Sequence, residues 1–158
     1  MIIISPYAKT APGAATVNPK NYPYWDDVIG LLKKDYDLIQ VGVTGEVPLV
    51  QDFRKGLPIQ DLRKLIGQCD TWISVDSFFQ HLCWDEGKKG VVIFSQSDPR
   101  IFGHVENINL LKDPKFLRGN QFQLWSQTAY NSDAYVTPEL VVKTVTANFL
   151  LTDKSRLI

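Results

Sequence analysis

The sequence predicts an α/β fold in which helices cover both faces of a mainly parallel sheet. Two observations carry this prediction. Short apolar runs alternate with segments whose apolar residues recur at helical spacing, which is typical of strands joined by crossover helices. The runs are also apolar at consecutive positions, as expected of strands buried on both faces. We therefore expect one Rossmann-like three-layer sandwich over residues 1–158, without repeats or a linker.

The predicted elements follow in order along the chain. Strands are expected at 2–4, 38–43, 71–75 and 90–94, with a weaker signal for a fifth at 107–111. Helices are expected from Pro23, from Ile59, over 78–86 with Gly87 as terminator, and from Pro138. Their apolar stripes are Trp25, Val28, Ile29 and Leu32, then Ile59, Leu62, Leu65, Ile66 and Cys69, and finally Leu140, Val141, Thr144, Val145 and Phe149. Segments 8–22 and 44–57 are expected to be loops, and 112–136 is expected to be irregular.

Composition and charge exclude several classes of protein. Lysine plus arginine and aspartate plus glutamate balance at 17 each, so the chain as a whole does not attract nucleic acid or an anionic membrane. No apolar run approaches the roughly 20 residues of a membrane span. Cys69 and Cys83 lie among apolar residues and are expected to be buried free thiols. Together with the lack of a signal-peptide pattern, these features predict a cytoplasmic protein.

The common cofactor and catalytic motifs are missing. The sequence contains no GxGxxG, no GxxxxGK[ST] and no GxSxG. With two histidines and no CxxC spacing, we expect no metal site and no cofactor. Ligands of parallel α/β sheets bind at the carboxyl ends of the strands. The candidate functional residues are therefore those that follow each strand.

Polar residues follow the first two predicted strands. Ser5, Tyr7 and Lys9 come after the first strand. Lys20 stands just before a helix N-terminus, where free N–H groups and a partial positive charge attract phosphate. Glu46 follows the second strand, where a carboxylate can accept hydrogen bonds from ribose hydroxyls. On the residues alone, a solvated loop lysine and a surface acid remain the alternatives for Lys20 and Glu46.

The junction after the third predicted strand carries the most information. Asp76, Ser77 and Phe78 join this strand directly to a helix, whose first N–H groups would face a bound phosphate. His81 lies about one turn further along, on the same side as Ser77. An aspartate at the end of a buried strand is costly unless it is paired or functional. Helix capping by Asp76 or Ser77, and a core position for His81, remain the structural alternatives.

These residues resemble a known family. The run 18–25 (NPKNYPYW) is similar to the Lys-x-Trp/Tyr-Pro helix start of heptosyltransferase-like enzymes with the two-domain GT-B architecture. The runs 57–70 and 72–82 are similar to the donor-domain block of that family, a helix and a strand followed by Asp-Ser/Thr-Gly-x-x-His. The runs 91–94 and 97–99 match the next strand and its turn. The resemblance covers residues 18–104 and rests on the order and spacing of these motifs.

The resemblance implies a domain that binds the nucleoside diphosphate of a nucleotide-sugar. It implies that Lys20 contacts phosphate or sugar, that Glu46 reaches the ribose and that Asp76 binds sugar hydroxyls. It also implies that Ser77, Phe78 and His81 line the phosphate site. We further assign Ser5, Tyr7 and Lys9 to the nucleotide, and Ser97 and Asp98 to the sugar, with a simple turn as the alternative for the last two.

Two departures from the family pattern bear on function. Phe78 stands where the family has a glycine, and its ring could narrow or reshape the phosphate site. The acceptor domain of the family, with its usual catalytic base, has no counterpart in the sequence. We therefore expect a glycosyltransferase that obtains the missing half from a homo-oligomer or a partner subunit, with Asp76 or Glu46 as candidate base. A non-catalytic nucleotide-sugar-binding protein and a nucleotide-sugar hydrolase are the alternatives. The aromatic residues of 116–135 fit an interface, a ligand wall or core.

Overall fold

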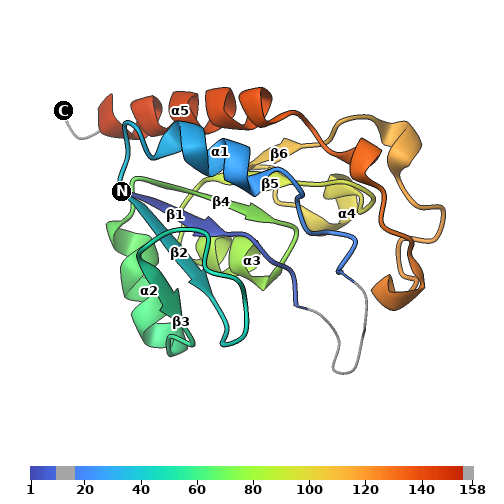
Figure 1. The fold of residues 1–158 in the computed structure, drawn as a ribbon, viewed down its shortest axis with the longest axis horizontal. Coiled ribbons are helices and arrows are strands. Elements are labelled where there is room, and N and C mark those ends of the chain that lie inside the picture. Colours follow the sequence, from blue (N-terminus) through green and yellow to red (C-terminus); the bar gives the residue numbers. More distant parts are fainter. Residues whose placement is uncertain (10–16, 155–158) are drawn as a thin grey trace.

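Six parallel strands form one sheet in the computed structural model, which describes residues 1–9 and 17–154 (Figure 1). The strands are β1 (Ile2–Ser5), β2 (Leu38–Gly42), β3 (Phe53–Lys55), β4 (Thr71–Val75), β5 (Val91–Ile93) and β6 (Ile108–Leu110). Their order across the sheet is β3-β2-β1-β4-β5-β6, and every neighbouring pair is parallel. This is the strand order of the dinucleotide-binding Rossmann fold, so the predicted fold class is confirmed.

Helices cover both faces of the sheet. The helices α1 (Trp25–Leu32) and α5 (Pro138–Lys154) lie on one face, and α2 (Ile59–Gln68) and α3 (Phe78–Asp85) lie on the other (Figure 1). A short helix, α4 (Pro99–Phe102), follows β5. The segment 112–136 is irregular, as predicted, and contains the 3-10 turns η1 (Pro114–Phe116), η2 (Trp125–Gln127) and η3 (Ser132–Ala134).

The apolar side chains of β1 pack into two hydrophobic cores, one on each face of the sheet. Ile2, Ile3 and Ile4 are all fully buried. Ile2 and Ile4 pack with Trp25 on the α1 and α5 face, whereas Ile3 packs with Leu65 on the α2 and α3 face. Successive side chains of a strand point to opposite faces of the sheet, so a strand covered on both sides needs apolar residues at every position.

The edge strand β3 lies in a segment that the sequence analysis expected to be loop. It is only three residues long and two of its side chains are exposed, so no apolar run marks it. The segment that leads into β3 is held in place by Gln40 of β2, which is fully buried. The Gln40 side-chain amide donates to the Val47 carbonyl oxygen at 2.9 Å and accepts from the Leu49 N–H at 2.6 Å. The contact of the Gln40 side chain with the 47–49 backbone therefore helps to position β3, and no pattern in the sequence of β3 itself indicates the strand.

Three helices differ in detail from the prediction. The helix α1 begins at Trp25 rather than Pro23, because Tyr24 has a non-helical backbone conformation. The helix α4 was not predicted, because the sequence indicated only a turn at 97–99, where this helix begins. On α5, Val141 is fully buried but Leu140 is 43% exposed, so the buried stripe of that helix is narrower than predicted.

Cys69 and Cys83 are free and buried, as predicted. Burial raises the pKa of the Cys69 thiol to about 11 and raises the pKa of Cys83 as well, so both thiols stay protonated and unreactive near neutral pH. Among the described residues, every helix is too short or too polar to cross a membrane. In that same part of the chain, no three His, Cys, Asp or Glu side chains gather closely enough to hold a metal ion.

Candidate functional site

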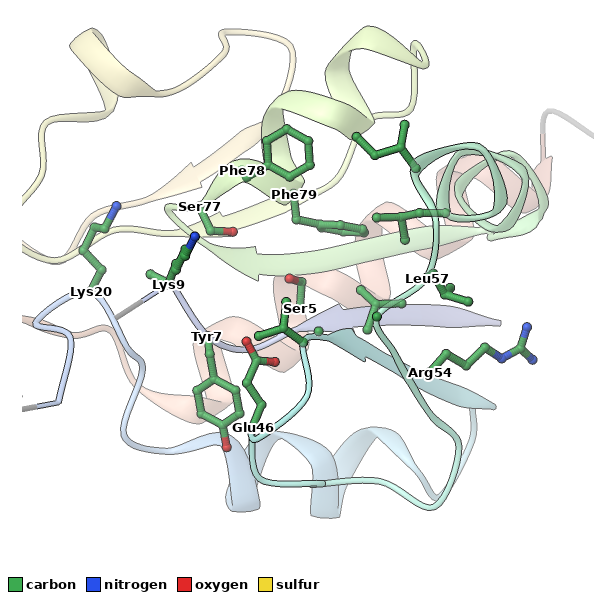
Figure 2. A pocket seen from close by; sticks show the side chains of 17 residues that line it. Ser5, Tyr7, Lys9, Lys20, Glu46, Arg54, Leu57, Ser77, Phe78 and Phe79 are labelled. Carbon is green, nitrogen blue, oxygen red and sulfur yellow. The ribbon is translucent and has the colours of Figure 1, made fainter. Parts of the chain in front are cut away.

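A cavity of about 460 Å³ opens at the carboxyl ends of β1, β2 and β4. The strand order reverses between β1 and β4, and open α/β sheets bind their ligands at this switch point. Figure 2 shows Ser77 and Phe78 on one side of the cavity and Tyr7 and Glu46 on the other. The predicted site residues that line it are Ser5, Tyr7, Lys9, Lys20, Glu46, Ser77 and Phe78.

The amino end of α3 contributes one wall of the cavity. Ser77 is the N-cap residue, yet its side chain makes no capping hydrogen bond. Its Oγ is buried and has no hydrogen-bond partner among the described residues. The first N–H groups of a helix lack intrahelical partners and carry a partial positive charge. This wall can therefore receive an anionic group through backbone N–H donors and the Ser77 hydroxyl.

Phe78 and Phe79 point to different surroundings. The Phe79 ring is buried and packs edge-on against Trp72 in the core. The Phe78 side chain is 60% exposed and lines the cavity beside the helix N-terminus. Because the Phe78 ring is not held by the core, it is available to contact a ligand.

Lys20 reaches the cavity from the loop that precedes α1. Its backbone N–H donates to Asn18 Oδ1 at 2.9 Å. The neighbouring Pro19 carbonyl oxygen accepts hydrogen bonds from the Tyr135 hydroxyl at 2.5 Å and from Ser95 Oγ at 3.3 Å. Residues from distant parts of the sequence thus anchor this loop, so the Lys20 side chain starts from a fixed backbone.

Asp76 lies next to the cavity and is 5% exposed. Its Oδ2 is 3.6 Å from Lys20 Nζ, and its Oδ1 accepts a hydrogen bond from Gln80 Nε2 at 2.7 Å. These partners offset the cost of burying the carboxylate. Charge-assisted hydrogen bonds are usually about 2.8 Å long, so Lys20 is near Asp76 without being tied to it. This geometry makes Asp76 suited to orient the Lys20 ammonium group.

Glu46 lies across the cavity from α3. Its carboxylate rests against Gly42, where an added Cβ would lie 1.8 Å from Glu46 Oε2. This oxygen is buried and has no hydrogen-bond partner in the described part of the chain. Burial raises the pKa of the Glu46 carboxyl, and a hydrogen bond from the Val43 backbone acts in the opposite direction. An unpartnered carboxylate oxygen at a cavity wall is suited to accept a hydrogen bond from a ligand hydroxyl.

Glu46→Gln is expected to raise the melting temperature at about pH 8 and to change it little at about pH 4. The folded-state pKa of Glu46 lies above its ordinary value of 4.5. Its contribution to stability is therefore complete below that value and is lost as the pH rises through the folded-state pKa. Glutamine does not ionise and escapes this loss. Melting curves of both proteins at the two pH values measure the effect, and an equal difference at both would contradict it.

The rest of the cavity is mainly apolar. Leu57, Ile59 and Leu62 line it from the start of α2, together with the edge of Phe79. Ile59 and Leu62 belong to the stripe that was predicted to be buried. The remaining residues of that stripe are buried, but Ile59 is 48% exposed because it faces the cavity. An apolar wall beside a few polar groups is the usual surrounding of a bound planar group.

Besides Asp76, three more of the predicted site residues lie outside the cavity wall. His81 is on the exposed side of α3, where its Nδ1 is 2.8 Å from His104 Nε2. Ser97 is fully buried and its Oγ lacks a hydrogen-bond partner among the described residues. Asp98 caps α4 by accepting from the Arg100 N–H at 2.9 Å, and it also pairs with the Arg100 guanidinium at 2.7 Å. Asp98 thus has the turn-forming role that stood as its alternative, and His81 is not a core residue.

The His81 ring is expected to make the protein less stable in mild acid. Burial lowers the pKa of His81, with His104 and Lys20 lowering it further and Asp76 opposing them. Folding favours the neutral ring, so stability that is complete above the ordinary pKa of 6.5 is lost as the pH falls through the folded-state pKa. His81→Gln should therefore lose less melting temperature than the parent between about pH 7 and about pH 5. Thermal unfolding at both pH values tests this, and identical losses would contradict it.

Comparison with known proteins gives matches of fold but not of sequence. No family model and no curated protein sequence matches the chain. Escherichia coli ADP-heptose LPS heptosyltransferase II superimposes with a TM-score of 0.67 at 16% identity, over 96% of this chain and 47% of that chain. The chain has the fold of one half of a heptosyltransferase.

Other heptosyltransferase-type structures give the same result. The glycosyl transferase family 9 protein of Veillonella parvula matches with a TM-score of 0.66 at 15% identity, over 95% of this chain and 46% of that chain. E. coli heptosyltransferase WaaC, solved with ADP, matches with a TM-score of 0.62 at 15% identity, over 93% of this chain and 43% of that chain. The chain thus spans about half the length of each heptosyltransferase-type protein that it matches.

Proposed function

We propose that the cavity binds a nucleoside diphosphate sugar and that the protein takes part in transfer of the sugar, as an oligomer or with a partner subunit. One observation carries this proposal. The amino end of α3 lies in the same cavity as Lys20 and Glu46. Within residues 1–9 and 17–154, Ser77 makes no capping hydrogen bond, and neither its hydroxyl nor Glu46 Oε2 has a hydrogen-bond partner. The first set suits a diphosphate, and the carboxylate suits a ribose hydroxyl.

The apolar part of the cavity would hold the base of the nucleotide. A base placed against Leu57, Ile59 and Leu62 would lie on the α2 side, with its ribose at Glu46 and its diphosphate at α3. These three groups follow one another in a nucleotide in the same order. In transfer, the helix N-terminus and Lys20 would stabilise the negative charge that develops on the leaving diphosphate.

Two carboxylates are candidates for the base that activates the acceptor. Asp76 was a candidate, but one of its oxygens accepts from Gln80 and the other faces Lys20. Glu46 has an uncommitted oxygen and a raised pKa, which suits a base better. Its place across from α3 suits ribose binding equally well. The commitment of Asp76 therefore favours, as a second candidate function, a protein that binds the nucleotide-sugar without turning it over.

Thermal-shift measurements with ADP, UDP, GDP, CDP and their common sugar conjugates test the proposal. A ligand that binds only the native protein raises the melting temperature by mass action. We expect one base to give a clear rise, shared by the diphosphate and its sugar conjugate. Failure of the whole panel to shift the melting temperature would contradict nucleotide binding.

Product analysis with the ligand selected in this way distinguishes a glycosyltransferase, a hydrolase and a non-catalytic binding protein. Transfer to an added acceptor identifies a glycosyltransferase, and release of free sugar identifies a hydrolase. An intact ligand after prolonged incubation identifies the binding protein. Lys64→Ala serves as the control for variants of the site residues, because the Lys64 side chain is mostly exposed on α2 and does not line the cavity.

A further inference from the structure

Arg118 lies in the irregular segment between β6 and α5, outside the cavity wall. Its guanidinium carbon is 3.4 Å from the ring centroid of Trp125 in η2. Lys20 Nζ lies 5.1 Å from the same centroid. Two cations from distant parts of the chain therefore share one aromatic ring, at the end of the cavity that Lys20 lines.

The Arg118 side chain is held in place but keeps unused donors. One terminal nitrogen, Nη1, donates to Thr128 Oγ1 at 2.9 Å, and the other, Nη2, donates to the Gln121 carbonyl oxygen at 2.6 Å. Its Nε is buried and has no hydrogen-bond partner among the described residues. A guanidinium carries five N–H donors in one plane. Stacking on Trp125 uses the face of the group, so the second N–H of each terminal nitrogen stays in the plane as a donor for an anion.

The charges around Arg118 do not balance. Among residues 1–9 and 17–154, no carboxylate forms a salt bridge with Arg118. Burial lowers the pKa of its guanidinium, and the nearby Asp76 carboxylate opposes this effect. Asp76 is also the acid that faces Lys20. Of these two cations, which lie on the same Trp125 ring, only Lys20 faces a carboxylate in the described part of the chain, and this arrangement suits an anionic ligand.

We propose that Arg118 is a second phosphate-binding residue, which with Lys20 clasps the distal phosphate of a bound diphosphate. The proximal phosphate would lie at the amino end of α3, and the chain of phosphates would pass Lys20 toward Trp125. This inference rests on the proposed nucleotide function and adds a selectivity to it: the site favours diphosphates over monophosphates, because only a diphosphate reaches both the amino end of α3 and the Lys20–Arg118 pair.

Titration calorimetry with inorganic pyrophosphate and inorganic phosphate tests the clasp without assuming a base. We expect the parent protein to bind pyrophosphate more tightly than phosphate. Arg118→Gln should weaken pyrophosphate binding about tenfold, as expected for loss of one charge-assisted contact, and leave phosphate binding within about twofold. Lys64→Ala, the mostly exposed lysine control, should behave like the parent. Equal losses for both anions, or no loss for either, would overturn the assignment of Arg118.

A second measurement needs no variant, in case Arg118→Gln fails to fold. The buried Nε–H of Arg118 gives a nitrogen–proton NMR signal in the parent protein. Pyrophosphate should shift this signal more than the same concentration of phosphate does. A signal that stays in place as pyrophosphate saturates the protein would overturn the clasp.

The two proposals fail in distinguishable ways. If a nucleoside diphosphate raises the melting temperature but Arg118→Gln binds it as tightly as the parent, the clasp is wrong and nucleotide binding stands. If neither pyrophosphate nor any nucleoside diphosphate binds the parent, nucleotide binding is wrong and the clasp is wrong with it.

Discussion

Gly90→Ala is expected to cause a large loss of stability. A Cβ at position 90 would lie 2.3 Å from Cδ2 and Cε2 of Trp72. The Trp72 indole is fully buried, its Nε1 donates to the Lys88 carbonyl oxygen at 2.9 Å, and its ring packs edge-on against Phe79. Neither the ring nor the strand can move without breaking these contacts. We expect a loss of about 3 kcal/mol in the free energy of unfolding.

Chemical denaturation of Gly90→Ala and of a matched control measures this effect. Gly119→Ala is the control, because an added Cβ there meets no atom within 4 Å and the residue has no positive φ. That variant should stay within about 0.5 kcal/mol of the parent. Similar unfolding free energies for Gly90→Ala and Gly119→Ala would show that Trp72 is not packed over Gly90 as described.

Lys20→Met is expected to cause the largest loss of ligand affinity. It removes a cation next to the amino end of α3 while keeping most of the apolar stem. One charge-assisted contact contributes about 1.5–3 kcal/mol, so the dissociation constant of a nucleoside diphosphate should rise about 10- to 100-fold. Titration calorimetry with the nucleotide selected by thermal shift measures it. An unchanged dissociation constant would remove Lys20 from the site.

Lys20→Met should also destabilise the fold, because Asp76 would then lack the cation that faces it. The double variant Lys20→Met/Asp76→Asn removes both charges and keeps an acceptor for the Gln80 amide. We expect the double variant to recover the melting temperature but not the affinity. Recovery of both would mean that Lys20 acts only by supporting Asp76.

The fold was largely predictable from the sequence because its strands are buried on both faces. Runs such as 2–4 and 90–94 are apolar at nearly every position, and this pattern predicts a parallel sheet without knowledge of the contacts. The strand β3 was missed because it lies at the sheet edge and most of it is exposed. The buried Gln40 side chain holds the chain just before β3. A single polar residue in an apolar run does not indicate which groups it will bond.

The cavity was predictable only in its polar half. Lys20, Glu46 and Ser77 follow strands or precede helices, so their place at one edge of the sheet follows from topology alone. The apolar half was not predictable from the sequence, because Ile59 has the same helical spacing as the buried residues of α2 and differs only in facing the cavity. Spacing distinguishes one face of a helix from the other, but not a core from a binding wall.

The sequence did not indicate where the aromatic residues of 116–135 lie in the fold. These residues fitted an interface, a ligand wall or core, and the structure divides them. Tyr135 is buried in the core, whereas Phe122 is 78% exposed. Trp125 lies beside Lys20, a contact between residues far apart in the sequence that no local pattern indicates. Arg118 stacks on the same ring, and this second long-range contact is likewise not indicated by the local sequence.

A crystal structure with the nucleoside diphosphate selected by thermal shift would test the central claim most directly. We predict that the diphosphate lies at the first N–H groups of α3 beside Ser77 and Lys20, with the ribose within hydrogen-bond distance of Glu46 and the base against Leu57 and Ile59. A nucleotide bound elsewhere on the protein, or bound here with its phosphates at Glu46, would contradict the account.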